Sequence, residues 1–123
     1  MYAPGPIVTP TGGGFNTTVT FSAGGQAAAV AGFGTVFIDA DYPSQGQSSL
    51  SVFSKAATLL QQSNVSGANA SQIFRGIVTV DAGNNPIPAI FSAKLVNGDG
   101  WPAGNSNEGV TLDDFVFADP VAW

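Results

Sequence analysis

The sequence predicts a mainly β protein: a β-sandwich of jelly-roll-like character or a small β-barrel, with an extended N-terminal arm and at most one short helix. Short runs of β-branched and aromatic residues recur along the chain, and several alternate between apolar and polar positions. Clusters of Gly, Asn, Asp and Pro separate these runs, which is typical of turns between strands. With 123 residues, the chain is long enough for one domain with a single core. We expect an arm over residues 1–14 and one β-rich domain, with a C-terminal tail, over residues 15–123.

The N-terminal segment has the composition of an extended arm. Three prolines fall within the first ten residues and disfavour both helix and central-strand structure, and a run of glycines at 12–14 forms a flexible joint. Between the prolines, Ile7, Val8 and Thr9 have strand-forming side chains, and an extended peptide of this kind adds to the edge of a neighbouring sheet. We therefore expect Ile7, Val8 and Thr9 to contact a partner. A disordered tail is the alternative.

Strand signals dominate the remaining sequence. The expected strands cover residues 17–21, 34–40, 73–80, 87–96 and 110–117. The turn-forming loop at 81–86 joins the third of these runs to the fourth, so the two are predicted to form a hairpin. Asp119 and Pro120 are expected to stop further pairing near the C-terminus.

Residues 51–62 depart from the strand pattern. Their apolar side chains fall at helical spacing behind a serine that can cap a helix: Val52, Ala56, Leu59 and Leu60, with Ser48 or Ser49 as the N-cap. The spacing predicts a short helix. A strand through Leu50 and Val52 is the alternative.

Ionisable side chains are scarce, which argues against an enzyme. The chain has 3 Lys and Arg, 8 Asp and Glu, no His and no Cys, so 9% of its residues are charged, against roughly 25% in an average soluble domain. Acid–base catalysis would fall to carboxylate pairs, Asp39 with Asp41 or Asp113 with Asp114. Because Asp41 begins a turn-like Asp-Tyr-Pro sequence, we expect no catalytic residues and no cofactor.

The loop that follows residue 96 is rich in oxygen donors. Asn97 and Asp99 are followed by Asn105, Asn107 and Glu108, and such donors suit calcium. The order of these residues does not match a calcium-binding EF-hand loop, because its fifth position is a tryptophan and its glycine is displaced. Turn chemistry explains the Asn-Gly and Asp-Gly pairs without an ion, so we expect no metal site.

The charge balance bears on partners and location. The net charge is −5, and the three cations, Lys55, Arg75 and Lys94, are far apart in the sequence. Nucleic acids and anionic membranes bind clustered cations, so we expect neither as a partner. The first six residues lack the basic and apolar regions of a secretory signal, and the absence of Cys fits synthesis in a reducing compartment.

Aromatic residues supply the remaining candidates for partner binding. Trp101 lies in a Gly/Asn/Pro loop, and Val121 and Trp123 lie in the C-terminal tail. Exposed tryptophans fill pockets in partners or stack on sugars, whereas folding of Trp101 over its own core is the alternative. Arg75, within an apolar strand, is either an exposed strand residue or the partner of a carboxylate across an interface. The remaining phenylalanines are expected in the core: Phe15, Phe21, Phe33, Phe37, Phe53, Phe74 and Phe91.

The arm from Ala3 to Pro10, the glycine joint, the β-rich domain, the low charge and the absence of Cys together resemble small structural proteins of bacteriophages, particularly capsid decoration (cement) proteins. The resemblance is one of composition across the whole chain. It implies a non-enzymatic virion protein that binds the major capsid protein, bridges neighbouring subunits through its arm and tail, and forms a homo-oligomer, with a trimer favoured.

Two other functions fit the composition. One is a lectin-like fibre or spike domain that binds glycans through Trp101, Asn105 and Asn107. The other is a self-assembling subunit of an extracellular filament or surface layer. A lectin is expected to be a stable soluble oligomer that recognises glycans, whereas a filament subunit polymerises without another protein.

Overall fold

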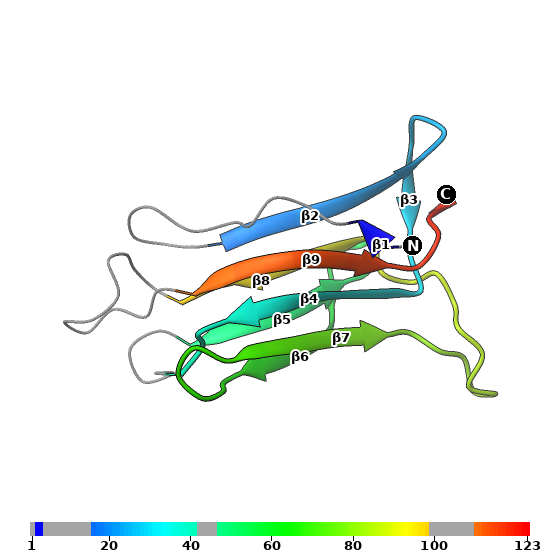
Figure 1. The fold of residues 1–123 in the computed structure, drawn as a ribbon. Coiled ribbons are helices and arrows are strands. Elements are labelled where there is room, and N and C mark those ends of the chain that lie inside the picture. Colours follow the sequence, from blue (N-terminus) through cyan, green and yellow to red (C-terminus); the bar gives the residue numbers. More distant parts are fainter. Residues whose placement is uncertain (1, 4–15, 42–46, 99–109) are drawn as a thin grey trace.

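The computed structural model describes residues 2–3, 16–41, 47–98 and 110–123. These residues form two antiparallel β-sheets that face each other across one hydrophobic core (Figure 1). The mainly β fold, a small β-sandwich or barrel, is therefore confirmed. The described part of the chain contains no helix.

One sheet has four strands and the other has six. The four-stranded sheet runs in the order β1 (Tyr2–Ala3), β9 (Thr111–Phe117), β4 (Gly32–Ile38) and β7 (Gln72–Val78). The six-stranded sheet runs in the order β10 (Val121–Ala122), β3 (Gln26–Ala29), β2 (Asn16–Ala23), β8 (Ser92–Val96), β5 (Ser48–Phe53) and β6 (Leu59–Val65). Within the described residues, β7 and β6 are the last strands on one side of the sandwich.

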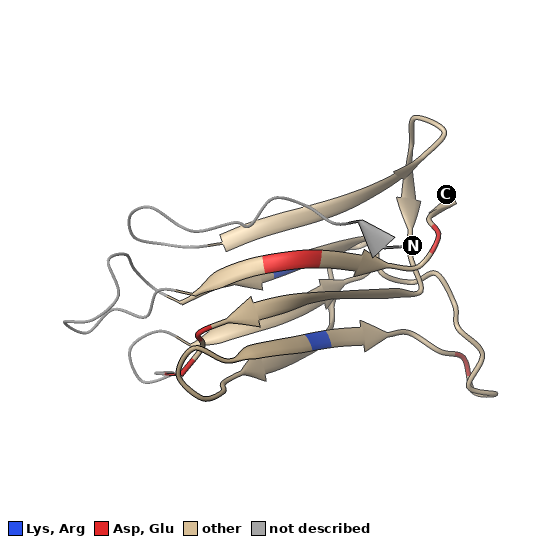
Figure 2. Ribbon diagram, in the orientation of Figure 1, with Lys and Arg blue, Asp and Glu red and all other residues tan. Residues whose placement is uncertain are grey.

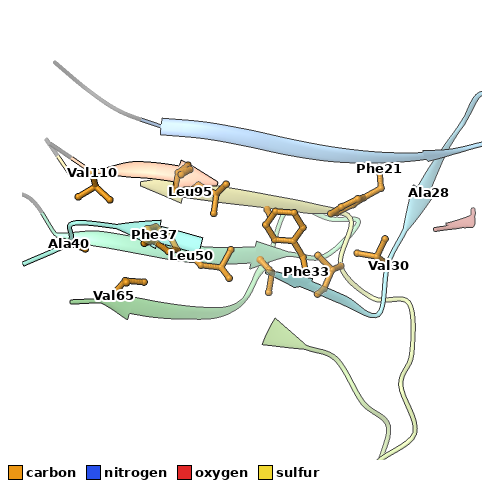
Figure 3. Close-up of a cluster of buried hydrophobic side chains, with 14 residues drawn as sticks. Phe21, Ala28, Val30, Phe33, Phe37, Ala40, Leu50, Val65, Leu95 and Val110 are labelled. Carbon is orange, nitrogen blue, oxygen red and sulfur yellow. The ribbon is translucent and has the colours of Figure 1, made fainter. Parts of the chain in front are cut away.

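The core follows from the alternation of side chains along each strand. Phe33, Thr35 and Phe37 of β4 are buried between the sheets, and Leu50 and Val52 of β5 are fully buried. Figure 3 shows the apolar side chains of this core, Phe33, Phe37 and Leu50 among them, gathered between the two layers. The other members of the buried core are Phe21, Ala28, Val30, Ala40, Val65, Ile90, Ala93, Leu95, Val110 and Leu112.

Only some of the phenylalanines occupy the core. Phe21, Phe33 and Phe37 are buried as expected. Phe74 is 56% exposed, so its placement in the core was wrong. The side chains of β7 alternate between the two faces of the sheet as the sequence predicted. Phe74, however, lies opposite Val36 on the outer face. Apolar residues therefore occur on both faces of β7.

The helix predicted over residues 51–62 is wrong. β5 and β6 form an antiparallel hairpin, and the Ser54 amide donates to the Thr58 carbonyl at 2.9 Å to close the turn. Ala57 in this turn has a φ of 59°. The alternative, a strand through Leu50 and Val52, is the one observed. The sequence was ambiguous here because a strand buried on both faces shows no alternation that distinguishes it from a helix.

The hairpin predicted from residues 73–80 and 87–96 is also wrong. β7 pairs with β4, whereas β8 lies between β2 and β5 in the other sheet. Pairing after the turn is limited to the Val80–Pro86 bridge and its flanking hydrogen bonds. Two prolines, Pro86 and Pro88, lack the amide donors that a longer hairpin would need, and the chain crosses to the six-stranded sheet.

Two further features differ from expectation at the chain's end. Asp119 and Pro120 do not stop pairing, because β10 pairs with β3, Val121 opposite Ala29. In β9, the register against β4 shifts between Gly34 and Val36, and Asp114 has a φ of 50°. This shift is a β-bulge.

Candidate interaction surface

An apolar groove lies on the outer face of the four-stranded sheet. Its volume is about 440 Å³, and residues of β4, β7 and β9 line it. The lining residues are Gly32, Phe33, Gly34, Phe74, Gly76, Ile77, Val78, Val116, Phe117 and Ala118. Among the described residues, no ionisable side chain lines the groove, so its chemistry suits an apolar group.

Glycines create the groove because they leave the outer face without side chains. Gly34 and Gly76 are register partners on β4 and β7. The ring of Phe74 lies over both of them: a methyl group on Gly34 would come within 2.5 Å of Phe74 Cζ, and one on Gly76 within 3.1 Å. Phe74 thus packs over a glycine floor while more than half of it stays exposed.

β7 is an edge strand whose outer side has no partner strand among the described residues. The Asp39 amide donates to Ser71 O, and the Thr79 amide donates to Ala31 O. The amide and carbonyl groups of successive residues point to alternate sides of an antiparallel strand. The backbone groups of the odd-numbered residues from Ser71 to Thr79 therefore point towards β4. The backbone groups of Gln72, Gly76 and the other even-numbered residues face away from the sheet.

The neighbouring edge, β6, is less suited to pairing. Its register with β5 shifts between Val52 and Phe53, which places a bulge near Leu60. Bulges and polar residues protect an edge from pairing, and β6 is polar from Gln61 to Asn64. β7, by contrast, pairs with β4 in continuous register over all seven residues. β7 is therefore the flatter and more apolar edge.

Arg75 is the charged residue of β7, and it points inward. It lies opposite Thr35, which is fully buried between the sheets. Figure 2 shows this cation as the blue segment of β7, beside strands with few charges. Its Nε is buried and has no hydrogen-bond partner in the described part of the structure. Arg75 is therefore not an ordinary exposed strand residue.

In each of the two carboxylate pairs considered for catalysis, one aspartate accepts a hydrogen bond from a backbone amide. Asp39 Oδ1 accepts from the Ala70 amide at 2.6 Å, and Asp113 Oδ1 accepts from the Asp114 amide at 2.9 Å. These bonds are typical of turns and bulges. No group of three or more potential metal ligands occurs among the residues that the structure describes.

A third carboxylate organises the loop after β7. Asp81 Oδ1 accepts hydrogen bonds from the amides of Asn85 at 3.0 Å and Gly83 at 2.8 Å, and both carboxylate oxygens contact Asn85 Nδ2. The backbone amide of Asn85, followed by its side chain and the Gly83 amide, lowers the pKa of Asp81 because these donors favour the charged form. Asp81 therefore holds the loop in its turn conformation.

The C-terminal tail lies on the six-stranded sheet. Val121 pairs with Ala29 and is largely exposed. Trp123 is 51% exposed, and its ring packs edge-on against Phe91 with centroids 4.7 Å apart. Lys55 Nζ lies 4.1 Å from the Trp123 ring centre, a cation–π contact that covers one ring face. Val121 and Trp123 are thus surface residues supported by their own chain.

The other predicted partner-binding residues, Ile7, Val8, Thr9 and Trp101, lie outside the described residues, as do Asn105 and Asn107. Most of the arm and most of the loop considered for calcium lie there too. Asn97 is described: it is buried, and its side-chain amide donates to Val110 O at 2.8 Å.

Comparisons with protein families, curated proteins and solved structures give no match to this chain. In the described part of the chain, no helix has the length and hydropathy needed to cross a bilayer.

The sequence reasoning missed the groove and the β7 edge. The signal was present as glycines at alternate positions, Gly32 and Gly34, with Gly76 inside a second strand. A glycine within a strand often marks a close approach by another group, but the register that brings Gly34 and Gly76 together is a tertiary property.

Proposed function

We propose that this protein is a non-enzymatic structural subunit that decorates or cements a virion capsid by bridging neighbouring subunits. The resemblance in composition to phage decoration proteins supports this role. The observation that carries it is the uncharged, glycine-floored groove of the four-stranded sheet, because a surface of this chemistry is matched by apolar side chains of another protein.

The exposed apolar side chains support the same role. An exposed apolar row runs along the outer face of β7 and the residues that follow it, formed by Phe74, Val78 and Val80. Leu59 and Trp123 are half-exposed elsewhere. Burial of such surface contributes about 25 cal/mol per Å² of apolar area. Each contact is modest, but many copies on one lattice multiply it through avidity.

The N-terminal arm and the C-terminal tail are the segments expected to bridge neighbouring subunits. In the described residues, the start of the chain already pairs as a strand, Tyr2 opposite Val116 at the side of β9. β10 likewise adds to β3. Both termini therefore take part in edge pairing within the chain, and the same pairing with neighbouring subunits would join a shell.

Virus particles purified on a density gradient test this role. The full chain is expected to co-sediment with the particles, and added chain is expected to bind particles that have been stripped of it. A variant lacking residues 1–14 should stay folded, as measured by circular dichroism, yet bind much more weakly. A variant lacking residues 121–123 tests the tail in the same way.

Two results would contradict the proposal. Absence of the chain from purified particles, or unchanged binding by both truncated variants, would remove the bridging role. Specific recognition of a sugar on a glycan array by a soluble oligomer that ignores particles would favour the lectin-like function instead.

A further inference from the structure

We propose that two copies of this chain associate through β7, which pairs antiparallel with β7 of the second copy about a two-fold axis at Gly76. The pairing joins the two four-stranded sheets into one continuous sheet. It goes beyond the proposed function, since it names a contact between copies and holds whether or not the chain binds a capsid.

The backbone of β7 provides the first argument. The even-numbered residues direct their amide and carbonyl groups away from β4, as the bonds at Ser71 and Thr79 establish. The Val80–Pro86 bridge shows that the chain stays extended to Val80. Gln72 to Val80 therefore presents an unbroken row of hydrogen-bonding groups on this edge, within the described residues.

The ends of this row select the position of the axis. Ala70 has a φ of 55°, which is not extended, and Asn84 lies in the turn that follows Asp81 with a φ of 62°. The usable segment is thus Gln72 to Val80, and Gly76 is its midpoint. A two-fold at Gly76 pairs every outward-facing backbone group with one in the second copy, whereas a shift in either direction leaves groups unpaired.

Charge provides the second argument for this register. A two-fold at Arg75 would set Arg75 directly opposite its own copy, and like charges at that spacing destabilise a strand pair. With the axis at Gly76, Arg75 lies opposite Ile77 of the second copy instead. An inward-pointing charge often protects an edge from pairing. In β7, Arg75 disfavours the register with the axis at Arg75 but is compatible with the register with the axis at Gly76.

The side chains complete the match. In this register Phe74 lies opposite Val78 of the second copy, and Val78 lies opposite Phe74. Phe74 is 56% exposed and Val78 63% exposed on the outer face, and aromatic side chains opposite β-branched ones are favourable cross-strand pairs. At the axis itself, Gly76 faces Gly76, so no side chain obstructs the approach.

The size of the contact fixes its expected strength. A phenylalanine buries about 150–250 Å² when it is fully covered, so each half-exposed Phe74 contributes on the order of 100 Å². A single strand pair remains below the roughly 800 Å² per partner of a stable complex. We therefore expect a weak dimer that depends on concentration. The trimer implied by the capsid-protein resemblance would need a different contact.

Sedimentation velocity of the full chain over a wide range of concentration tests the association. The unmodified chain is expected to shift from monomer to dimer. Val78→Lys places a charge on the apolar pair and should abolish the dimer. Leu59→Lys, a matched charge on the half-exposed β6 edge, should leave the dimer unchanged. Circular dichroism of both variants verifies that they are folded.

Single-cysteine variants test the register independently of any loss of folding. The chain has no Cys, so an introduced thiol is the sole one. Cα atoms across a hydrogen-bonded pair are about 5.5 Å apart, so Gly76→Cys should give a dimer with a short bis-maleimide cross-linker. Phe74→Cys should not, because its equivalent positions lie about 14 Å apart along the strands.

A chain that remains monomeric at every concentration, and whose Gly76→Cys variant does not cross-link, would overturn the proposal. A dimer lost with Leu59→Lys but kept with Val78→Lys would assign the contact to β6. Cross-linking through Phe74→Cys or Arg75→Cys in preference to Gly76→Cys would overturn the register. A dimer that forms normally in a chain that fails to bind stripped particles would leave the β7 pairing intact while removing the proposed function, so the two failures are distinguishable.

Discussion

The close approach of Phe74 to Gly34 leads to a quantitative prediction for the variant Gly34→Ala. The added methyl group would lie 2.5 Å from Phe74 Cζ and 2.9 Å from the backbone oxygen of Arg75. The ring can rotate away because Phe74 is more than half exposed, but the Arg75 oxygen belongs to the paired strand and cannot. We therefore expect the strands to be pushed apart at this point.

The magnitude follows from two opposing effects. Overpacking of a well-ordered site typically costs about 1–3 kcal/mol. Replacement of glycine by alanine stabilises by about 0.4–1 kcal/mol, because it restricts the unfolded chain. The expected net loss in the free energy of unfolding thus lies between about 0 and 2.6 kcal/mol, with a central value of about 1.3 kcal/mol.

Gly76→Ala is the matched control. It lies directly across from Gly34 in the register, yet its methyl group would contact only the movable Phe74 ring, at 3.1 Å, with the Phe33 oxygen at 3.6 Å. We expect its effect to stay within about 0.5 kcal/mol. The double variant Gly34→Ala/Phe74→Ala should recover part of the loss, but not the part due to the Arg75 oxygen.

Urea unfolding, followed by circular dichroism at a concentration where the chain is monomeric, measures all three variants. Parallel slopes would show that only stability has changed. Equal midpoints for Gly34→Ala and Gly76→Ala would refute the reasoning, as would full recovery in the double variant. Either result would mean that the strand backbone yields as readily as an exposed ring.

Three further predictions concern the core, a buried hydroxyl and the loop carboxylate. Leu112→Ala, at a fully buried site, should lower the free energy of unfolding by about 2–5 kcal/mol, and a loss below 1 kcal/mol in urea unfolding would contradict its place in the core. Thr35→Val removes the hydroxyl that donates to the Asp113 carbonyl at 2.9 Å, so it should cost about 1–3 kcal/mol; an unchanged unfolding midpoint would show that this bond is dispensable. Asp81→Ala should lower the melting temperature near neutral pH, and the difference should disappear as the pH falls through the lowered pKa of Asp81, since a depressed pKa stabilises only above it. A difference that persists in strong acid would assign the effect to loop packing.

The fold class could be predicted from the sequence because the relevant signals are local. The alternation in residues 73–80 and the burial of Phe33 and Phe37 depend only on the two-residue repeat of a strand. The partners of each strand could not be predicted in this way. Residues 73–80 and 87–96 are joined by a turn-rich loop, yet they belong to different sheets, since pairing depends on contacts distant in sequence.

The β5–β6 error has a different cause. The segment contains apolar residues that satisfy helical spacing, and β5 is buried on both faces, so the two-residue repeat is hidden there. Packing in the sheet, rather than intrinsic preference, decides such a segment.

The apolar groove could not be located from the sequence. The sequence indicated a protein with little charge and exposed aromatic residues, and it directed attention to Trp123 and Val121, which are exposed. Phe74 was assigned to the core because nothing in the alternation of β7 distinguishes its inner face from its outer face. Only the partner strand, with Gly34 opposite Gly76, shows which side carries the groove.

The bulge in β9 determines which side chains the last long strand can contribute to the interior. Leu112 and Phe115 are three positions apart in the sequence, so in a regular strand they would point to opposite sides. The bulge at Asp113 and Asp114 absorbs one residue, so both Leu112 and Phe115 pack on the core. Deletion of one aspartate would place Leu112 and the phenylalanine two positions apart, so a regular strand would keep both on the core. The expected consequence of this deletion is therefore loss of the bulge and its local twist, with the aromatic half of β9 still facing inward.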